Sequence, residues 1–194
     1  MRGEKIMLLE IKQYGDPVLR VECAPVEKVD LEHNTLAVNM LETMYAAEGI
    51  GLAAPQVGLG IRMVVIDIPE ESIEGEEDAT VMLNGEAVPM RSIMPLVFIN
   101  PKLEPYGKQE LCQEGCLSVR NIRSNVMRPS RVKATLPQLD GKVLELDCGG
   151  LLARCLQHEC DHLDGFLFTD RVSSAAKITL TKRLKNLLHL HAQD

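Results

Sequence analysis

The sequence predicts an α+β fold, with antiparallel sheets packed around a central helix, an N-terminal helix and a C-terminal helix. Runs rich in Val and Ile lie in the middle of the chain, whereas helical periodicity occurs at 31–47, 151–163 and about 173–190. Strands that are separated from helices along a chain are typical of this fold class. The length of 194 residues is ample for one hydrophobic core, so we expect a single domain over residues 1–194.

The N-terminal part combines an extended segment with an amphipathic helix. Residues 8–13 are expected to form a short strand or an extended entry, followed by a turn at 15–17. Apolar residues then recur every three or four positions, at Leu36, Met40, Met44 and Ala47. This spacing predicts one buried face of a helix, and Gly49 is its stop signal.

Four strand-like runs lie further along the chain. Ile61–Ile68 and Leu96–Asn100 are rich in large apolar residues and are predicted as buried strands. Val132–Leu136 and Val143–Leu146 are separated by an Asp-Gly pair at 140–141, which predicts a hairpin.

An acidic segment at about 70–94 accounts for the net charge of −7. Its residues 70–90 contain seven Asp or Glu residues and no Lys or Arg, and the 21 acidic residues elsewhere balance the 21 Lys and Arg residues. The Asn-Gly pair at 84–85 lies between the apolar runs 81–83 and 87–88, which indicates a hairpin. A solvated excursion on the surface is the alternative interpretation.

The composition excludes several classes of protein. No stretch is long enough to span a membrane, and the apolar run Ile6–Leu9 is too short for a signal peptide. Met7 is an alternative start, because residues 1–6 resemble a ragged leader. We therefore expect a cytoplasmic protein whose six cysteines are free thiols or metal ligands, with no membrane partner. The lack of a basic patch argues against DNA as a partner.

The motif H-E-x-x-H occupies His158, Glu159 and His162 within the predicted helix 151–163. Successive residues of a helix turn by about 100°, so the two imidazoles lie about 40° apart on one face and Glu159 lies beside them. Two neutral imidazoles in this arrangement bind one divalent cation, and the carboxylate can act as a general base. The motif predicts a metal-dependent hydrolase.

A catalytic metal needs a third protein ligand. Residues 163–168 contain no His, so this ligand is expected elsewhere in the chain, and the cysteines are the obvious source. Cys116 is one candidate, and Cys112 and Cys155 are its rivals. Cys160 projects about 200° from the first His of the motif and is expected to pack in the core.

A glycine-rich segment, Gly49–Gly58, precedes the first predicted buried strand. Its start matches the dinucleotide-binding pattern G-x-G-x-x-A, but it follows a helix instead of a strand and has Pro55 where a helix would begin. We therefore reject that function. We interpret the segment as an extended wall that a substrate backbone can approach closely, with Gln56 as an amide donor. A plain connecting turn is the alternative.

Three ordered motifs resemble the peptide deformylase family. They are G-I-G-L-A-A-P-Q-V-G at Gly49–Gly58, E-G-C-L-S at Glu114–Ser118 and Q-H-E-C-D-H-L-D-G at Gln157–Gly165. The similarity extends from Leu8 to about Arg171. The resemblance implies a hydrolase that removes the formyl group from the N-terminal formyl-methionine of newly synthesised polypeptides. Its partners would be N-formylmethionyl nascent peptides.

The resemblance also implies a metal site and a catalytic group. One divalent ion would be held by Cys116, His158 and His162. This ion is usually Fe²⁺ in the family, with Zn²⁺, Ni²⁺ or Co²⁺ as substitutes. Glu159 would move the proton, while the side-chain amide of Gln56 and the backbone N–H of Leu117 would stabilise the oxyanion.

Further residues are implied to bind substrate or to orient the ligands. The substrate-binding residues would be Ile50, Gly51, Glu114, Arg123, Leu151, Arg154 and Cys155. Arg128 would pair with Glu114 or Asp161 and thereby orient the metal ligands. Two features depart from the family pattern. Arg120-Asn121 stands where the family usually has Pro-Gly, at the rim of the substrate groove, and the acidic segment 70–94 is an insertion.

Other hypotheses remain open. A different H-E-x-x-H metallopeptidase would cleave internal peptide bonds. A structural zinc module would use Cys112 or Cys155 as a fourth ligand, and a homologue without activity would only bind. The basic helix at 173–190 is expected mainly to pack on the protein, and a ribosome contact through it is a further hypothesis.

Overall fold

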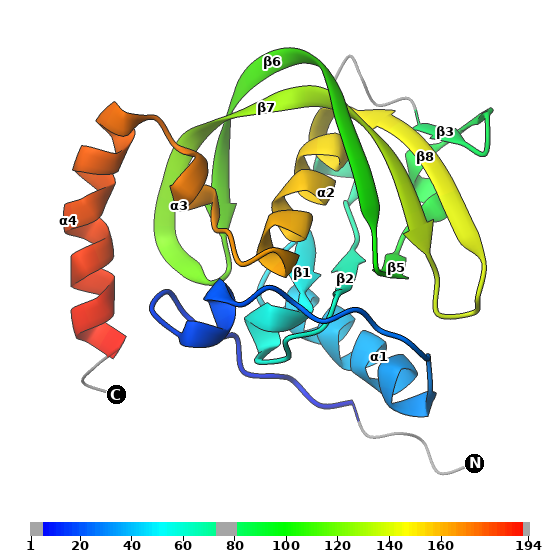
Figure 1. Cartoon of the computed structure of the whole chain (residues 1–194), viewed down its shortest axis with the longest axis horizontal. Coiled ribbons are helices and arrows are strands. Elements are labelled where there is room, and N and C mark those ends of the chain that lie inside the picture. Colours follow the sequence, from blue (N-terminus) through cyan, green and yellow to red (C-terminus); the bar gives the residue numbers. More distant parts are fainter. Residues whose placement is uncertain (1–5, 73–80, 192–194) are drawn as a thin grey trace.

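Figure 1 shows the computed structural model of the chain, which describes residues 6–72 and 81–191. These residues form two antiparallel sheets with helices beside and between them, so the predicted α+β class is confirmed. Most of the leader and the centre of the acidic segment, residues 73–80, lie outside the described residues. No helix among the described residues is both long and apolar enough to cross a membrane.

The smaller sheet has three antiparallel strands in the order β1–β2–β5. Their bounds are β1 Gly51–Ala53, β2 Met63–Ile66 and β5 Leu96–Ile99. Every residue of β2 is buried, which explains its unbroken apolar sequence. The two predicted buried strands are thus present, although each is shorter than expected.

The glycine-rich segment is an extended wall only in its first half. β1 pairs with β2, with Gly51 opposite Ile66. Ala54–Val57 then forms a short 3-10 helix, η2, so the expectation of an extended chain is wrong there. Pro55 lies in the first turn of η2, where its missing N–H costs no hydrogen bond.

The larger sheet has five strands in the order β4–β3–β8–β7–β6. Their bounds are β3 Val81–Leu83, β4 Glu86–Val88, β6 Lys102–Cys116, β7 Val119–Pro137 and β8 Val143–Gly149. The predicted hairpin is the pairing of β7 with β8, in which Leu136 lies opposite Leu144. β6 and the first half of β7 were not predicted from the sequence, and they form a long curved ribbon across the molecule (Figure 1).

The described part of the acidic segment belongs to this sheet. β3 and β4 form a hairpin at Asn84-Gly85, where both φ angles are positive, as a tight two-residue turn requires. β3 also pairs with β8, and Val81 is 1% exposed. The hairpin interpretation is therefore confirmed. Most of residues 84–92 are exposed, and only Val81 and Met90 of residues 81–93 are buried.

The helices begin and end close to their predicted positions. The predicted helices are α1 Leu31–Ala46, α2 Gly150–Leu163 and α4 Ser174–His191, whereas the short α3 Phe168–Arg171 was not predicted. Further 3-10 helices are η1 Pro17–Arg20, η3 Glu70–Ser72 and η4 Met90–Ile93. Residues 8–13 are extended but form no strand, and the Lys12 N–H donates to the Gln56 carbonyl oxygen.

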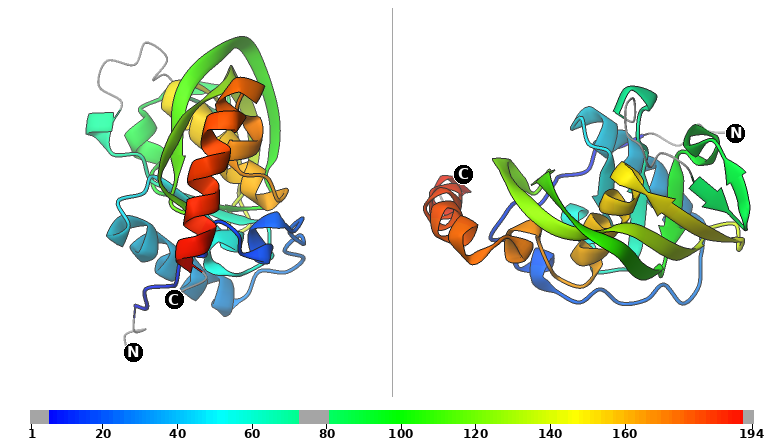
Figure 2. Two further views of the ribbon diagram at one scale, coloured as in Figure 1. Left: turned by 90° about the vertical axis from the view of Figure 1, so that its left-hand side faces the viewer. Right: turned by 90° about the horizontal axis from the view of Figure 1, so that it is seen from above.

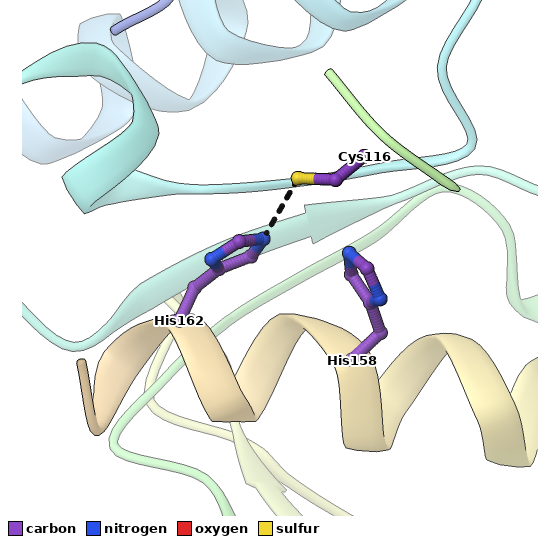
Figure 3. A group of neighbouring side chains, drawn as sticks. All are labelled: Cys116, His158 and His162. Carbon is purple, nitrogen blue, oxygen red and sulfur yellow. Dashed lines mark hydrogen bonds between the residues drawn. The ribbon is translucent and has the colours of Figure 1, made fainter. Parts of the chain in front are cut away.

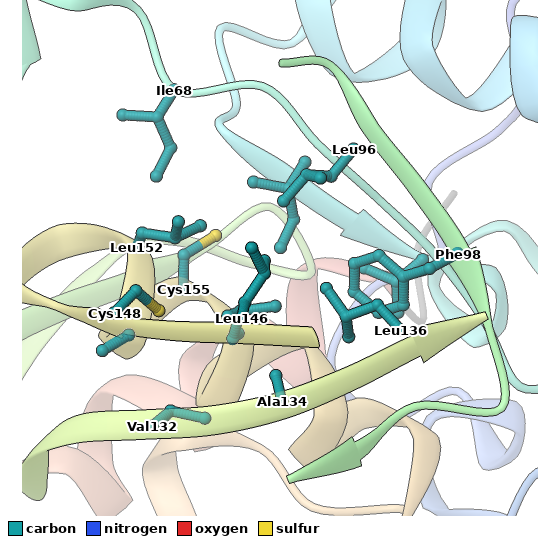
Figure 4. Packing of buried hydrophobic residues seen from close by; sticks show 14 of the residues in the cluster. Ile68, Leu96, Phe98, Val132, Ala134, Leu136, Leu146, Cys148, Leu152 and Cys155 are labelled. Carbon is teal, nitrogen blue, oxygen red and sulfur yellow. The ribbon is translucent and has the colours of Figure 1, made fainter. Parts of the chain in front are cut away.

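Helix α2 is covered by apolar side chains from both sheets. Leu152 and Cys155 pack against strand residues such as Phe98, Leu136 and Leu146 (Figure 4). A separate apolar cluster joins α4 to β7 and to the segment that contains η1. Figure 2 shows α4 at one side of the molecule, next to the ribbon of β6 and β7. The core therefore fixes α2 between the sheets and leaves its motif facing β1 and the end of β6.

Candidate metal centre and substrate cleft

Helix α2 presents its two imidazoles on one face. The ring centroids of His158 and His162 are 5.1 Å apart and the rings are nearly perpendicular. Leu152, Leu156 and Leu163 are buried on the opposite side of the helix, which fixes its rotation. His162 is 1% exposed, and its Nδ1 atom has no hydrogen-bond partner among the described residues.

Cys116 reaches this face from the end of β6. The ribbon changes register there: Gly115 lies opposite Arg123, but Cys116 lies opposite Val119. Such irregularities bend a strand and redirect a side chain. The Cys116 Sγ atom lies 3.3 Å from His162 Nε2, and Figure 3 shows it above the two rings.

These three side chains form a group that fits a metal ion. One ligand atom from each of Cys116, His158 and His162 lies within 4.8 Å of the others. Tetrahedral coordination by sulfur and nitrogen places such atoms about 3.5 Å apart. Thiolate and imidazole suit Zn²⁺ and Fe²⁺ better than Mg²⁺ or Ca²⁺. Among the described residues, neither Cys112 nor Cys155 belongs to the group, and Cys160 is buried in the core as expected.

A buried ion-pair network surrounds His158. Its Nδ1 atom lies 2.8 Å from Glu114 Oε2. Arg128 donates from Nε to Glu114 Oε1 over 2.5 Å, and from Nη1 to Asp161 Oδ2 over 2.9 Å. Arg128 thus makes both of the pairs that were expected as alternatives. Burial alone would raise the pKa of Glu114, but the hydrogen bonds from His158 and Arg128 lower it to about 2.

Two members of this environment were not found from the sequence. Arg171 donates from Nη2 to Asp161 Oδ1 over 2.6 Å, and the Phe168 ring is stacked on His158 with centroids 6.2 Å apart. Both follow the motif closely in the chain. Their spacing is not that of a helix face, however, because the chain turns between α2 and α3, so no periodic signal identifies them.

Glu159 is a buried carboxylate beside the three ligands. It is 4% exposed, and its Oε2 atom has no hydrogen-bond partner among the described residues. Burial raises the pKa of Glu159 to about 7. Its side chain lies against Gly51 of β1, where an added Cβ atom would lie 2.8 Å from Glu159 Cδ. Only glycine leaves room for this carboxylate at that position.

Gln56 and Leu117 approach the site from the other side. The Gln56 Oε1 atom accepts a hydrogen bond from the Ala53 N–H over 2.8 Å. Its Nε2 atom donates to Ser118 Oγ and lies 3.4 Å from Cys116 Sγ. Gln13 donates to the Leu117 carbonyl oxygen over 3.2 Å, which holds the turn between β6 and β7 against the N-terminal segment.

A cleft of about 1020 Å³ opens beside these groups. All seven residues predicted to bind substrate line it: Ile50, Gly51, Glu114, Arg123, Leu151, Arg154 and Cys155. Glu114 lines the cleft and its carboxylate also forms hydrogen bonds with His158 and Arg128. Ser72 of η3 and Arg183 of α4 also line the cleft, and neither was predicted from the sequence.

Comparison with known proteins extends the resemblance to peptide deformylases along nearly the whole chain. The profile of the polypeptide deformylase family matches residues 8–177. The chain belongs to this family. A peptide deformylase from Novosphingobium aromaticivorans is 44% identical over 92% of this chain and 96% of that protein.

Solved structures of peptide deformylases also share the fold. The enzyme from Synechococcus elongatus in complex with actinonin is 40% identical, with a TM-score of 0.75, and covers 92% of this chain and 88% of its own. The Met-Ala-Ser-bound class I type b enzyme from Acinetobacter baumannii is 32% identical, with a TM-score of 0.72, and covers 87% of this chain and 100% of its own. Peptide deformylases are metalloenzymes that remove the N-terminal formyl group from nascent polypeptides, and this chain is a deformylase.

Proposed function

We propose that this deformylase holds one divalent metal ion through Cys116, His158 and His162, and that Glu159 is its catalytic acid and base. The observation that carries the proposal is the approach of one thiol and two imidazoles to within 4.8 Å, beside a buried carboxylate with a free oxygen and an open cleft. A fourth protein ligand is absent from this group among the described residues, which favours a catalytic site over a closed structural zinc site.

Glu159, Gln56 and Leu117 have different roles in the proposed reaction. A bound divalent ion supplies Lewis acidity, which lowers the pKa of water and polarises a carbonyl group. Glu159 takes the proton from the attacking water and later gives it to the departing amine. The Gln56 amide and the Leu117 N–H stabilise the negative charge that develops on the formyl oxygen.

The methionine side chain of the substrate is assigned to the apolar part of the cleft. Ile50, Leu151 and Cys155 line this part, close to His158. Arg123 lies further out, across the ribbon from Gly115, and would bind the peptide beyond the first residue. The Acinetobacter baumannii relative was crystallised with Met-Ala-Ser bound, and a peptide of this kind is the product that the proposal requires.

Glu159→Gln tests the central role. The variant is expected to retain its metal, because the ligands are untouched, and to lose about 100-fold or more in turnover. Formate release from a formyl-Met-Ala peptide and the metal content per chain are the two measurements. Glu86→Gln, on the exposed β4, is the control and should behave as the unchanged enzyme. Retained turnover in Glu159→Gln would refute the role given to this carboxylate.

A product analysis separates deformylation from peptidase activity. Mass spectrometry of a longer formyl-Met peptide should show loss of the formyl group alone, with every peptide bond intact. Internal cleavage would favour the metallopeptidase alternative.

The proposal extends to the metal, the partners and the setting. We infer Fe²⁺ as the ion in the cell, with Zn²⁺, Ni²⁺ or Co²⁺ as substitutes, and metal analysis after anaerobic purification tests this. The whole chain serves as one catalytic domain that meets nascent peptides in the cytoplasm.

Lys177 and Lys182 are exposed on α4 and are candidates for a ribosome contact. Co-sedimentation of the enzyme with ribosomes, with and without these two charges, tests that contact.

A further inference from the structure

Helix α4 borders two neighbouring cavities. Arg183 lines the substrate cleft, and Leu188 lines a second cavity of about 880 Å³. These residues are five positions apart, which corresponds to about 7.5 Å along a helix. Ala47, just after α1, lines both cavities. The second cavity therefore continues from the cleft along α4.

The start of β7 lies at the junction of the two cavities. Asn121 lines the cleft, while its neighbour Arg120 lines the second cavity. Arg183 donates from Nη2 to the Asn121 carbonyl oxygen over 2.8 Å, which ties α4 to this point. Leu180, one turn earlier in α4, is buried against β7. The position of Arg183 is thus fixed by the packing of its helix and by one hydrogen bond.

Three Arg side chains and one exposed acid, Glu48 beside Ala47, lie at this junction, so its net charge is positive. Arg120, Arg123 and Arg183 are exposed, and none of them forms an ion pair with another described residue. The acids of the second cavity are already engaged: Glu10 pairs with Lys12 over 2.6 Å, and Asp16 caps η1. Unpaired guanidinium groups are suited to bind carboxylates.

We propose that the second cavity is a subsite for the part of the nascent polypeptide downstream of formyl-methionine, and that Arg183 and Arg120 select acidic side chains there. This rests on the proposed function, because the formyl end must lie beside Glu159. The remainder of a long substrate then has to leave the cleft, and the continuous wall of α4 offers it a path. The stretch Arg120-Asn121, which departs from the family pattern, lies on that path.

The test uses peptides that differ only downstream. The metal-loaded enzyme is assayed with formyl-Met-Ala-Ala-Glu-Glu-Ala amide and with the same peptide carrying two Lys in place of the two Glu. The ratio of the two kcat/KM values is the readout. We expect the unchanged enzyme to favour the acidic peptide by about 2- to 5-fold, since exposed ion pairs are weak, and to lose this preference in high salt.

Variants identify the responsible side chains. Arg183→Gln and Arg120→Gln should each reduce the ratio, mainly through KM, while Arg183→Lys should largely retain it because the charge remains. Lys182→Gln removes a charge from the adjacent position of α4, which lies outside both cavities, and should leave the ratio unchanged. An equal loss for both peptides in Arg183→Gln would indicate general damage to α4 and would overturn the proposal.

Two further outcomes are also decisive. Equal kcat/KM values for the two peptides in the unchanged enzyme would overturn the subsite. Turnover of formyl-Met-Ala amide separates a failure of the subsite from a failure of the proposed function. If this short peptide releases formate while the two longer peptides show no difference in kcat/KM, the proposed function stands and the subsite fails. If the short peptide releases none, the proposed function itself fails.

Discussion

At the scale of single residues, Gly51 affects where the carboxylate of Glu159, the proposed catalytic acid and base, lies. An added Cβ atom there would overlap the Glu159 carboxyl group, so this carboxylate would have to shift toward the adjoining cleft. Gly51→Ala is expected to lower kcat by about 10- to 100-fold, because small misplacements of a reacting group are costly. Formate release measures the effect.

Gly60→Ala is the matched control for this prediction. Its added Cβ atom would meet Val21 Cγ2 at 3.6 Å, which is an ordinary contact. This variant should keep the activity of the unchanged enzyme. Equal activities for the two variants would contradict the steric argument.

Arg128 is the residue on which the ion-pair network depends. It lies between Glu114 and Asp161, with side-chain exposures of 7%, 8% and 10%. Arg128→Met leaves Glu114 with only His158 and Asp161 with only Arg171 as charged partners, so the free energy of unfolding should fall by about 3–5 kcal/mol. Urea denaturation of the metal-loaded enzyme measures this change.

Arg20→Met is the comparison for Arg128→Met. The Arg20–Asp170 pair is partly exposed, with side-chain exposures of 42% and 34%. Solvent screens such a pair, so its loss should cost no more than about 1 kcal/mol. If the two substitutions lower the free energy of unfolding by the same amount, burial is not the reason that the network stabilises the fold.

The site residues were predictable to different degrees. His158, Glu159 and His162 follow from helical geometry alone, since their spacing fixes their relative directions. The third ligand does not, because the sequence offers several cysteines and only the fold brings Cys116 to the helix. Glu114 was predicted to bind substrate. Its bond to His158 depends on a strand and a helix that meet only after folding.

At the scale of elements, the ribbon of β6 and β7 is the part of the fold that the sequence pattern does not predict. Most side chains of β6 are exposed, so the strand lacks an apolar alternation, and it contains Pro105 and two glycines as well. Such features normally argue against a strand. As an edge strand it needs only one neighbour, and its long pairing with β7 compensates for the weak pattern.

The hairpin of β3 and β4 and the following η4 make a testable contribution to stability. Met90 of η4 is 5% exposed and packs in the same cluster as Leu152 of α2. Met90→Ala is expected to lower the free energy of unfolding by about 2–5 kcal/mol, because it leaves a cavity in the core. Met127→Ala, at a residue of β7 that is 50% exposed, should change it by less than about 0.5 kcal/mol. Similar values in chemical denaturation would mean that this segment is not part of the core.

At the scale of the whole molecule, the ligands join two separate parts of the chain. Cys116 and His162 are 46 positions apart, on the end of the ribbon and on the central helix. A metal ion that binds both should stabilise the folded state, since the unfolded chain does not hold the ligands together. The buried residues of the three apolar clusters include none of the three candidate ligands, so the fold itself should persist without the metal.

Metal removal and return test this coupling. The chelator-treated enzyme should remain folded by circular dichroism and unfold cooperatively. Free Zn²⁺ at 100 times its dissociation constant should add about 2.7 kcal/mol to the free energy of unfolding. Cys116→Ser should lose most of this gain at the same Zn²⁺ concentration, whereas Cys112→Ser, four residues earlier on β6 and outside the ligand group, should keep it. An equal gain in both variants would show that Zn²⁺ binds elsewhere. Unfolding on chelation alone would instead favour a structural zinc module, because a catalytic ion in a preformed cleft is not required to hold the sheets together.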